Sequence, residues 1–370
     1  MNAPGGFTQV LRALLAAHGP SGYERDPAAV WCRAADAIGA QVAIDVVGTP
    51  SARVAARDEG GEPRGGGGEG AAPRRLVVMG HIDEIGLIVT HIDDDGYLWF
   101  REVGGWDAQI LVGQRVTIAT REGHVPGVIG KKPIHLLRDE ERKKVAEVRD
   151  LHIDIGARDG EHAASLVRIG DVAVIAAEPL ELPNGRIASR ALDNRLGSFV
   201  ALESARLVAE RGGAHGWEVV AVAAAQEEIT FGGSRTSAFS LQPHAAIVVD
   251  VTHATDAPGI EVKEAGKHPL HSGPVLARGS TLNPRLFELL HHTAQQEAIP
   301  FTLEASGRNT GTDADAVHLS RGGVPTALVS IPLRYMHSPV ELVALDDVHA
   351  CARLIAAAAM RLDPDVSFAR

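Results

Sequence analysis

A run of seven small or β-branched apolar residues, 219–225, places the strongest constraint on how this chain can fold. The run is short and uncharged, so it predicts a strand buried on both faces. Glu227 and Glu228 follow almost at once, and two adjacent carboxylates cannot both face a core. We expect them at the rim of a sheet, where α/β folds bind ligands. Taken alone, this segment has two equally good interpretations. The two glutamates form either a solvated strand end or a metal ligand next to a free carboxylate that acts as a base.

A second buried strand is predicted at 76–79, and it leads into His81 and Asp83. Residues two apart at a strand end point to the same face, so these side chains are expected to lie together. A histidine alone is more often structural than functional. The pair, placed directly after an apolar strand, indicates a metal ligand with a supporting carboxylate.

Two further strands, at 245–251 and 326–331, bring Asp250 and His337 to the same kind of position. Asp193 precedes a helix that we predict to run to about residue 210. A carboxylate in that position can simply cap the helix, which is the alternative to a role in the site. Strand ends on one edge of a parallel sheet converge in space, however far apart they are in sequence.

The resulting set contains two histidines, several carboxylates and no cysteine. Such donors suit zinc, cobalt or manganese rather than a structural thiolate-bound zinc. Five ligands and one free carboxylate are the side chains that a site needs to hold two metal ions with one carboxylate bridging them. Two metal ions about 3.5–4 Å apart can together activate a water molecule and polarise a carbonyl group.

The length of 370 residues suggests roughly two domains, at about 150 residues for each. From about residue 86 to 183, short alternating strands separated by Gly and Pro predict a small β-rich domain. The pattern returns to α/β alternation near residue 184. Apolar periodicity and breaker residues also predict helices at 7–18, 27–38, 284–298 and 345–361, a strand at 42–47, and loops at 58–74 and 259–282.

Composition excludes several classes of protein. A net charge of −11 argues against a nucleic-acid partner, because the phosphate backbone requires a basic surface. Cys32 and Cys351 are too few for a disulfide framework and fit a reducing compartment. Neither a signal peptide nor an apolar run of about 18 residues is evident. We therefore expect a cytoplasmic protein without a membrane partner.

Six segments then resemble the tetrahedral (TET) and glutamyl aminopeptidases, which are dinuclear metallopeptidases. In chain order they are GHIDEIGLIV, ALDNRLGS, QEEITFGG, VVDVTHATD, GTDADAVHLSRGGVP and HSPVE. Two segments of the β-rich region, GVIGKKPIHLL and LHIDIGARD, resemble the dimerisation domain of that family. The resemblance covers nearly the whole chain, and six motifs in the same order are highly specific.

The resemblance implies an α/β fold with a mixed sheet flanked by helices, in a zinc-peptidase-like catalytic domain. That domain would comprise residues 1–85 and 184–370. A small β-barrel-like dimerisation domain, residues 86–183, would be inserted into it. It also implies a homo-oligomer, with a twelve-subunit assembly of dimers as one form.

Site residues carry over position by position. His81 and Asp250 would bind one divalent metal ion, Glu228 and His337 the other, and Asp193 would bridge them. Zinc is the expected metal, with cobalt and manganese as alternatives.

The same resemblance gives roles to two further carboxylates. Glu227 would be the general base, and Asp83 would orient the imidazole of His81 through its second ring nitrogen. The Asp193–Asn194 peptide bond would be cis, as in the resembling enzymes. The expected reaction is removal of N-terminal residues from short peptides with a free amino group, by a water that the two metals activate.

Some segments depart from the family pattern. Asn194 stands where many relatives have Asp, and Ile229 and Thr230 replace an aliphatic residue and a glycine. The Gly-rich loop at 58–74 and the longer segment at 264–280 resemble insertions. These changes remove no expected metal ligand. They leave open which side chain the enzyme prefers at the N-terminus of its substrate.

Two other functions use a similar set of residues. A carboxypeptidase or N-acyl amino-acid deacylase would need an arginine to hold the substrate carboxylate, and Arg334 is the nearest candidate. A catalytically silent scaffold could hold metal for stability alone. A glycosidase is disfavoured, because it needs two unligated carboxylates and only Glu227 is free.

Overall fold

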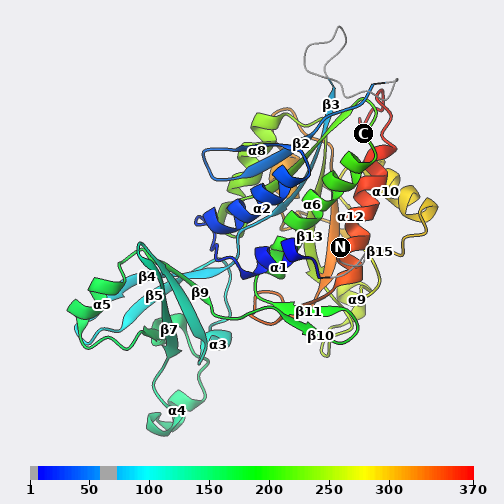
Figure 1. The fold of residues 1–370 in the computed structure, drawn as a ribbon. Coiled ribbons are helices and arrows are strands. Elements are labelled where there is room, and N and C mark those ends of the chain that lie inside the picture. Colours follow the sequence, from blue (N-terminus) through cyan, green and yellow to red (C-terminus); the bar gives the residue numbers. More distant parts are fainter. Residues whose placement is uncertain (1–6, 59–72) are drawn as a thin grey trace.

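The computed structural model describes residues 7–58 and 73–370, and its central element is an eight-stranded mixed sheet (Figure 1). The strand order is β1-β2-β12-β3-β13-β16-β14-β15. The bounds are β1 Gln41–Ile44, β2 Pro50–Val54, β3 Arg74–His81, β12 Trp217–Ala224, β13 Ala245–His253, β14 Val275–Gly279, β15 Thr302–Ser306 and β16 Thr326–Leu333.

The four predicted apolar strands β12, β3, β13 and β16 are neighbours and run parallel. Their carboxyl ends therefore meet at one edge, as the sequence predicts; Ala224, for example, lies opposite His81. β2 and β14 pair antiparallel with β12 and β16, which makes the sheet mixed.

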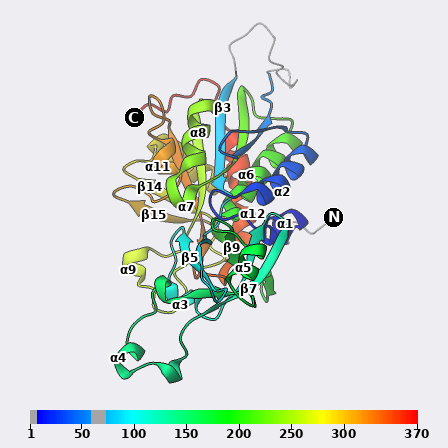
Figure 2. The same cartoon turned by 90° about the vertical axis from the view of Figure 1, so that its left-hand side faces the viewer.

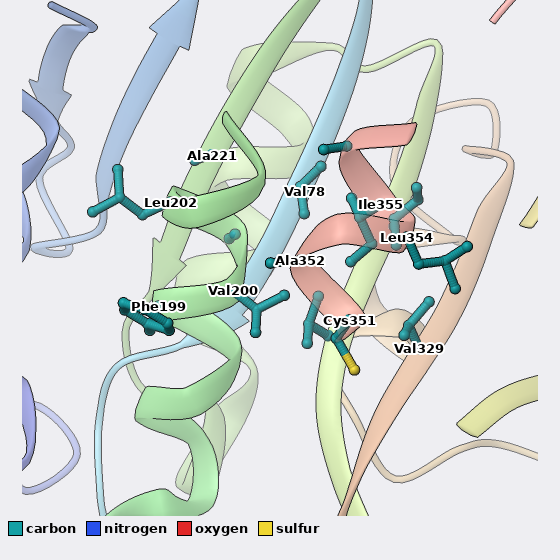
Figure 3. Close-up of a cluster of buried hydrophobic side chains, with 14 of the residues drawn as sticks. Val78, Phe199, Val200, Leu202, Ala221, Val329, Cys351, Ala352, Leu354 and Ile355 are labelled. Atoms are coloured by element: carbon teal, nitrogen blue, oxygen red, sulfur yellow. The ribbon is translucent and has the colours of Figure 1, made fainter. Parts of the chain in front are cut away.

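Successive side chains of each strand point to opposite faces of the sheet, so the core consists of two layers. Leu76 and Val78 of β3 point into the larger layer, under five helices. These helices are α1 Gln9–Ala16, α2 Arg25–Ala37, α6 Leu192–Glu210, α10 Pro284–Gln296 and α12 Leu345–Met360. Val77 and Met79 point to the opposite face, which α8 Gly232–Leu241 and α11 Ala314–Val317 cover. Figure 3 shows Val78 between side chains of α6 and α12.

The β-rich segment folds as a closed barrel with the strand order β4-β5-β8-β7-β6-β9. Its strands are β4 Gly86–Ile92, β5 Leu98–Val103, β6 Arg115–Thr120, β7 Gly123–Gly130, β8 His152–Asp154 and β9 Val172–Ile175. The short helices α3 Ala108–Leu111, α4 Asp139–Arg142 and α5 Gly160–Leu166 accompany it. The barrel has its own apolar core and projects from one end of the α/β domain (Figures 1 and 2). The predicted insertion of a barrel-like domain is confirmed.

Some predicted elements were wrong in detail. The segment 259–282 is more than a loop, because it contains α9 (Val262–Ala265) and strand β14. The strand predicted at 42–47 is shorter and ends at Ile44. A separate three-stranded sheet, β10 Leu180–Leu182, β11 Arg186–Ser189 and β17 Glu341–Ala344, was not predicted. The loop predicted at 58–74 lies, apart from its ends, outside the described residues.

None of the described helices is both long enough and apolar enough to cross a membrane.

Strand β3 and helix α6 approach so closely that only glycine fits between them. A Cβ atom on Gly80 would lie 2.3 Å from the carbonyl carbon of Gly197, which is backbone and cannot turn aside. This contact fixes the distance between His81, which follows Gly80, and Asp193 at the start of α6.

We expect Gly80→Ala to lower the free energy of unfolding by about 3 kcal/mol, because the added methyl group forces β3 and α6 apart. Gly307→Ala is the matched control, since a Cβ atom there has no neighbour within 4 Å. Its stability should stay within about 1 kcal/mol of the parent chain. Urea denaturation of the parent and the two variants measures both changes in the free energy of unfolding. Equal denaturation midpoints for Gly80→Ala and the parent would contradict the packing described.

Candidate active site

His81 is the last residue of β3, and the chain then turns so that Ile82 N donates to Ala224 O at 2.8 Å. The following Asp83 is completely buried. Its carboxylate accepts the backbone N–H groups of Glu227 and Glu228, both at 3.1 Å. One carboxylate thus ties the end of β3 to the turn that carries the paired glutamates.

The predicted contact between Asp83 and the imidazole of His81 is longer than these two bonds. Oδ1 of Asp83 lies 3.4 Å from Nδ1 of His81, while the backbone oxygen of Asp83 lies 3.3 Å from the same nitrogen. Asp83 therefore contacts His81 and also positions the paired glutamates. The second contact was missed, because backbone hydrogen bonds leave no mark in side-chain spacing.

Asp193 lies in the first turn of α6, with non-helical backbone angles, and its peptide bond to Asn194 is cis as predicted. The N-cap alternative is wrong: the side chain that accepts an N–H group at the start of the regular helix is that of Asn194, not that of Asp193. The Asn194 amide donates to Val249 O at 2.8 Å, while its oxygen accepts Gly197 N–H at 2.9 Å. A deprotonated Asp at this position could not donate a hydrogen bond to Val249 O, which explains physically why Asn fits here.

The two oxygens of Asp193 face two different imidazoles. Oδ1 is 3.1 Å from His81 Nε2, and Oδ2 is 3.4 Å from His337 Nε2. Each imidazole also approaches one of the paired glutamates: Glu227 Oε2 lies 3.7 Å from His81 Nε2, and Glu228 Oε1 lies 3.5 Å from His337 Nε2. Asp193 therefore stands between two half-sites.

His337 follows β16 in a loop, and Glu341 at the start of β17 fixes it. Oε1 of Glu341 accepts His337 N–H at 2.9 Å, and Oε2 accepts Asp193 N–H at 3.0 Å. Glu341 is 2 % exposed, so it is a buried clamp between two site residues. Sequence reasoning gave it no role. The signal was present in HSPVE, which carries a carboxylate four residues after the histidine.

A buried ionic network supports the same region from behind. Glu84 accepts Arg195 Nη2 at 2.8 Å and forms a second ion pair with Arg190. Arg195 also donates to Leu14 O at 2.8 Å and to Ile82 O at 3.1 Å. Burial opposes ionisation of Glu84, but the two guanidinium groups hold its carboxyl pKa below its usual value. These residues join α1, the β3 end and α6, and sequence spacing did not reveal them.

Asp250, in β13, completes the set of predicted ligands. The six predicted residues other than Asp83 line one cavity of about 440 Å³. They are His81, Asp193, Glu227, Glu228, Asp250 and His337. A larger cavity of about 700 Å³, between α2 and the barrel, has no comparable cluster among its described lining residues. The barrel also reaches the site, because a Cβ atom on Gly105 would lie 3.3 Å from His337 Nδ1.

Burial and the crowding of like charges raise the pKa values of three carboxyl groups in this cavity, those of Glu227, Glu228 and Asp250. Burial, together with the carboxylates of Asp250 and Asp313, raises the pKa of Glu227 to about 10. Burial also raises the pKa values of Glu228 and Asp250. Hydrogen bonds to Asp193 and Glu228 raise the pKa of His337 to about 11. The protein chain alone therefore leaves negative charge here that protons or cations must balance.

Asp313, the residue before α11, is a further buried carboxylate. It makes no capping bond, and Thr312 Oγ1 accepts Ala314 N–H instead. Its charge raises the pKa of both Glu227 and Asp250. Asp313 thus belongs electrostatically to the site, although it does not line the cavity.

Two overlapping triplets bring ligand atoms within 4.8 Å of one another. They are His81, Asp193, Glu228 and His81, Glu227, Asp250. A third triplet of this kind lies on the surface of α10, away from the cavity, and consists of Glu288, His291 and His292. Glu228 belongs to the first triplet, and Glu227, the predicted base, belongs to the second. The distances between ligand atoms alone therefore do not decide which of the two glutamates binds a metal ion.

Comparison with known proteins identifies the family of this chain. The family model of the M42 glutamyl aminopeptidases matches residues 66–354. The chain belongs to the M42 glutamyl aminopeptidase family. It is therefore a metalloaminopeptidase, a hydrolase of peptides, and the resemblance to the TET aminopeptidases is confirmed.

Individual M42 relatives cover most of the chain. A lysyl aminopeptidase of Pyrococcus furiosus is 37% identical over 300 residues, which are 80% of this chain and 84% of that protein. The crystal structure of a TET aminopeptidase from Thaumarchaeota archaeon SCGC AB-539-E09 is 35% identical, with a TM-score of 0.86 over 96% of both chains. The Pyrococcus horikoshii TET1 peptidase, which assembles into a tetrahedron or an octahedral shell, is 29% identical; its TM-score is 0.79 over 96% of this chain and 99% of that chain.

We expect Glu341→Gln to weaken divalent-metal affinity by about 10- to 100-fold, because an amide offers one acceptor where His337 and Asp193 need two. Competition with a chromogenic chelator measures the affinity. Glu264→Gln, a change of an exposed glutamate on α9, is the control and should bind metal like the parent. Parent-like affinity in Glu341→Gln would contradict the role of the clamp.

Proposed function

We propose that this M42 enzyme binds two divalent metal ions and removes the N-terminal residue from short peptides with a free amino group. The observation that carries the proposal is the position of Asp193, whose two oxygens face His81 at 3.1 Å and His337 at 3.4 Å. A carboxylate shared in this way suits a bridging ligand between two ions.

The donor set fits two such ions. His81 and Asp250 would hold one ion, and Glu228 and His337 the other, with Asp193 between them. Imidazole and carboxylate donors without thiolates suit zinc, which we propose as the native metal, with cobalt and manganese as alternatives. The excess of buried acid in the chain supports this assignment, since two dications would balance it.

Bound metal ions of this kind lower the pKa of water and polarise a carbonyl group. In the proposed mechanism, Glu227 accepts the proton of the attacking water and passes it to the leaving amine. Asp83 holds the backbone at Glu227 and Glu228, so that each carboxylate keeps to its own half of the site. We assign Glu228, which lies beside His337, to the second ion and Glu227 to proton transfer, as the resemblance to the TET aminopeptidases implies.

Arg334 does not support the carboxypeptidase or deacylase alternative. Its guanidinium forms two hydrogen bonds with Asp256, at 3.0 and 2.6 Å, and it does not line the cavity. Among the described residues, the lining includes no lysine or arginine that could hold a substrate carboxylate. This composition favours a substrate with a free amino group.

We further propose that the barrel, with residues 86–183 as its boundaries, mediates dimerisation within a homo-oligomer. Large apolar side chains near its tip are exposed: Ile134 by 60%, Leu136 by 67% and Val145 by 61%. Exposed apolar groups in one region favour contact with another protein surface. The shells formed by the Pyrococcus horikoshii relative support a larger assembly as one form.

Glu227→Gln should retain two metal ions per chain but lower kcat by at least about 100-fold, because the amide cannot accept the proton. Glu228→Gln, one residue away, should instead lose metal. Atomic absorption of the purified variants and hydrolysis of leucine p-nitroanilide separate the two effects. Full turnover in Glu227→Gln, or metal loss there, would refute the division of roles.

Chelation should abolish hydrolysis of amino-acid amides, and re-addition of zinc, cobalt or manganese should restore it. A peptide and its N-acetylated form, assayed side by side, test the requirement for a free amino group. Cleavage of the acetylated peptide at an equal rate would favour the deacylase class. A metal-replete, folded protein that cleaves neither would favour the scaffold.

A further inference from the structure

We propose that Glu304 makes this site select peptides whose first side chain is cationic, namely lysine or arginine. The inference rests on the proposed function, since it assumes that the cavity beside the metal ligands receives the N-terminal residue. Glu304 lies in β15, far in sequence from every predicted ligand, and lines the same 440 Å³ cavity.

The carboxylate of Glu304 is available for a ligand. It is half-buried, and Thr252 Oγ1 donates to its Oε1 at 3.4 Å. Within the described chain, no lysine or arginine forms an ion pair with it, in contrast to Arg334 with Asp256. The remaining oxygen can therefore accept a hydrogen bond from a charged donor, and charge-assisted bonds of this kind are the stronger ones.

Other carboxylates in the cavity do not compete for this role. Asp193, Glu228 and Asp250 belong to the proposed metal set, and Glu227 to proton transfer. Glu304 is thus the acidic group of the lining that neither function uses. It can discriminate between substrates without disturbing the reacting atoms.

The rest of the lining suits the stem of a long basic side chain. Phe231, Val251 and Met336 contribute apolar surface to the cavity. Lysine and arginine bury their methylene groups against such surface while the charged end seeks a polar partner. An acidic first residue would instead meet a like charge at Glu304, with no lysine or arginine in the described lining to offset it.

The most direct experiment compares lysine and norleucine p-nitroanilides on the zinc-loaded enzyme, because these substrates share a stem and differ in the charged end. We expect kcat/KM to be at least about 10-fold higher for lysine, and Glu304→Gln to remove most of that advantage. Hydrolysis of the norleucine substrate by Glu304→Gln should stay within about 3-fold of the parent. High salt should reduce the lysine advantage in the parent enzyme.

Glu264→Gln, which changes an exposed glutamate on α9 outside the cavity, is the matched control and should keep the parent ratio. Glu304→Lys provides a second test, since it should shift preference toward a glutamate substrate. Circular dichroism and metal content check that each variant is folded and loaded.

The two proposals fail in different ways. If the parent cleaves norleucine as well as lysine and Glu304→Gln leaves the ratio unchanged, the selectivity assigned to Glu304 is wrong, while the aminopeptidase mechanism stands. If the loaded parent cleaves none of these substrates, the proposed function fails and the inference fails with it.

Discussion

One buried carboxylate, placed between two imidazoles, organises this molecule. Asp193 lies 3.1 Å from His81 and 3.4 Å from His337, so its two oxygens join the two halves of the site. The parallel central strands of the mixed sheet supply the rest of the arrangement, because the strand ends that carry His81, Asp250 and the paired glutamates share one edge. The large α6–α12 core behind this edge keeps these ends in register.

Holding so many acids together requires support from residues that never face a substrate. Glu341 clamps the backbone at His337 and Asp193, and Asp83 clamps the turn of the paired glutamates. The Glu84–Arg195 pair secures the loop after His81 to α6. These clamps fix the backbone where repulsion between like charges would otherwise push the acidic side chains apart.

The sequence was informative where a pattern is local. Apolar strands followed by His81, Glu227 or Asp250 predicted side chains that the structure brings to one cavity, and alternating short strands predicted the β-rich domain that folds as the barrel. The hydrogen bond from Asp193 N–H to the Glu341 carboxylate was not predictable, because the two residues lie 148 positions apart and the donor is a main-chain group. Strand β14 was missed because its pairing with β16 and β15, rather than its own sequence, makes it a strand. Glu304 reaches the cavity through the same non-local pairing.

The central claim is that Asp193 bridges two metal ions, and anomalous diffraction from crystals grown with zinc tests it most directly. Data collected at the zinc absorption edge should give two peaks per chain, about 3.5–4 Å apart, with Asp193 between them. A single peak, or a pair of peaks that Asp193 does not contact, would contradict the account.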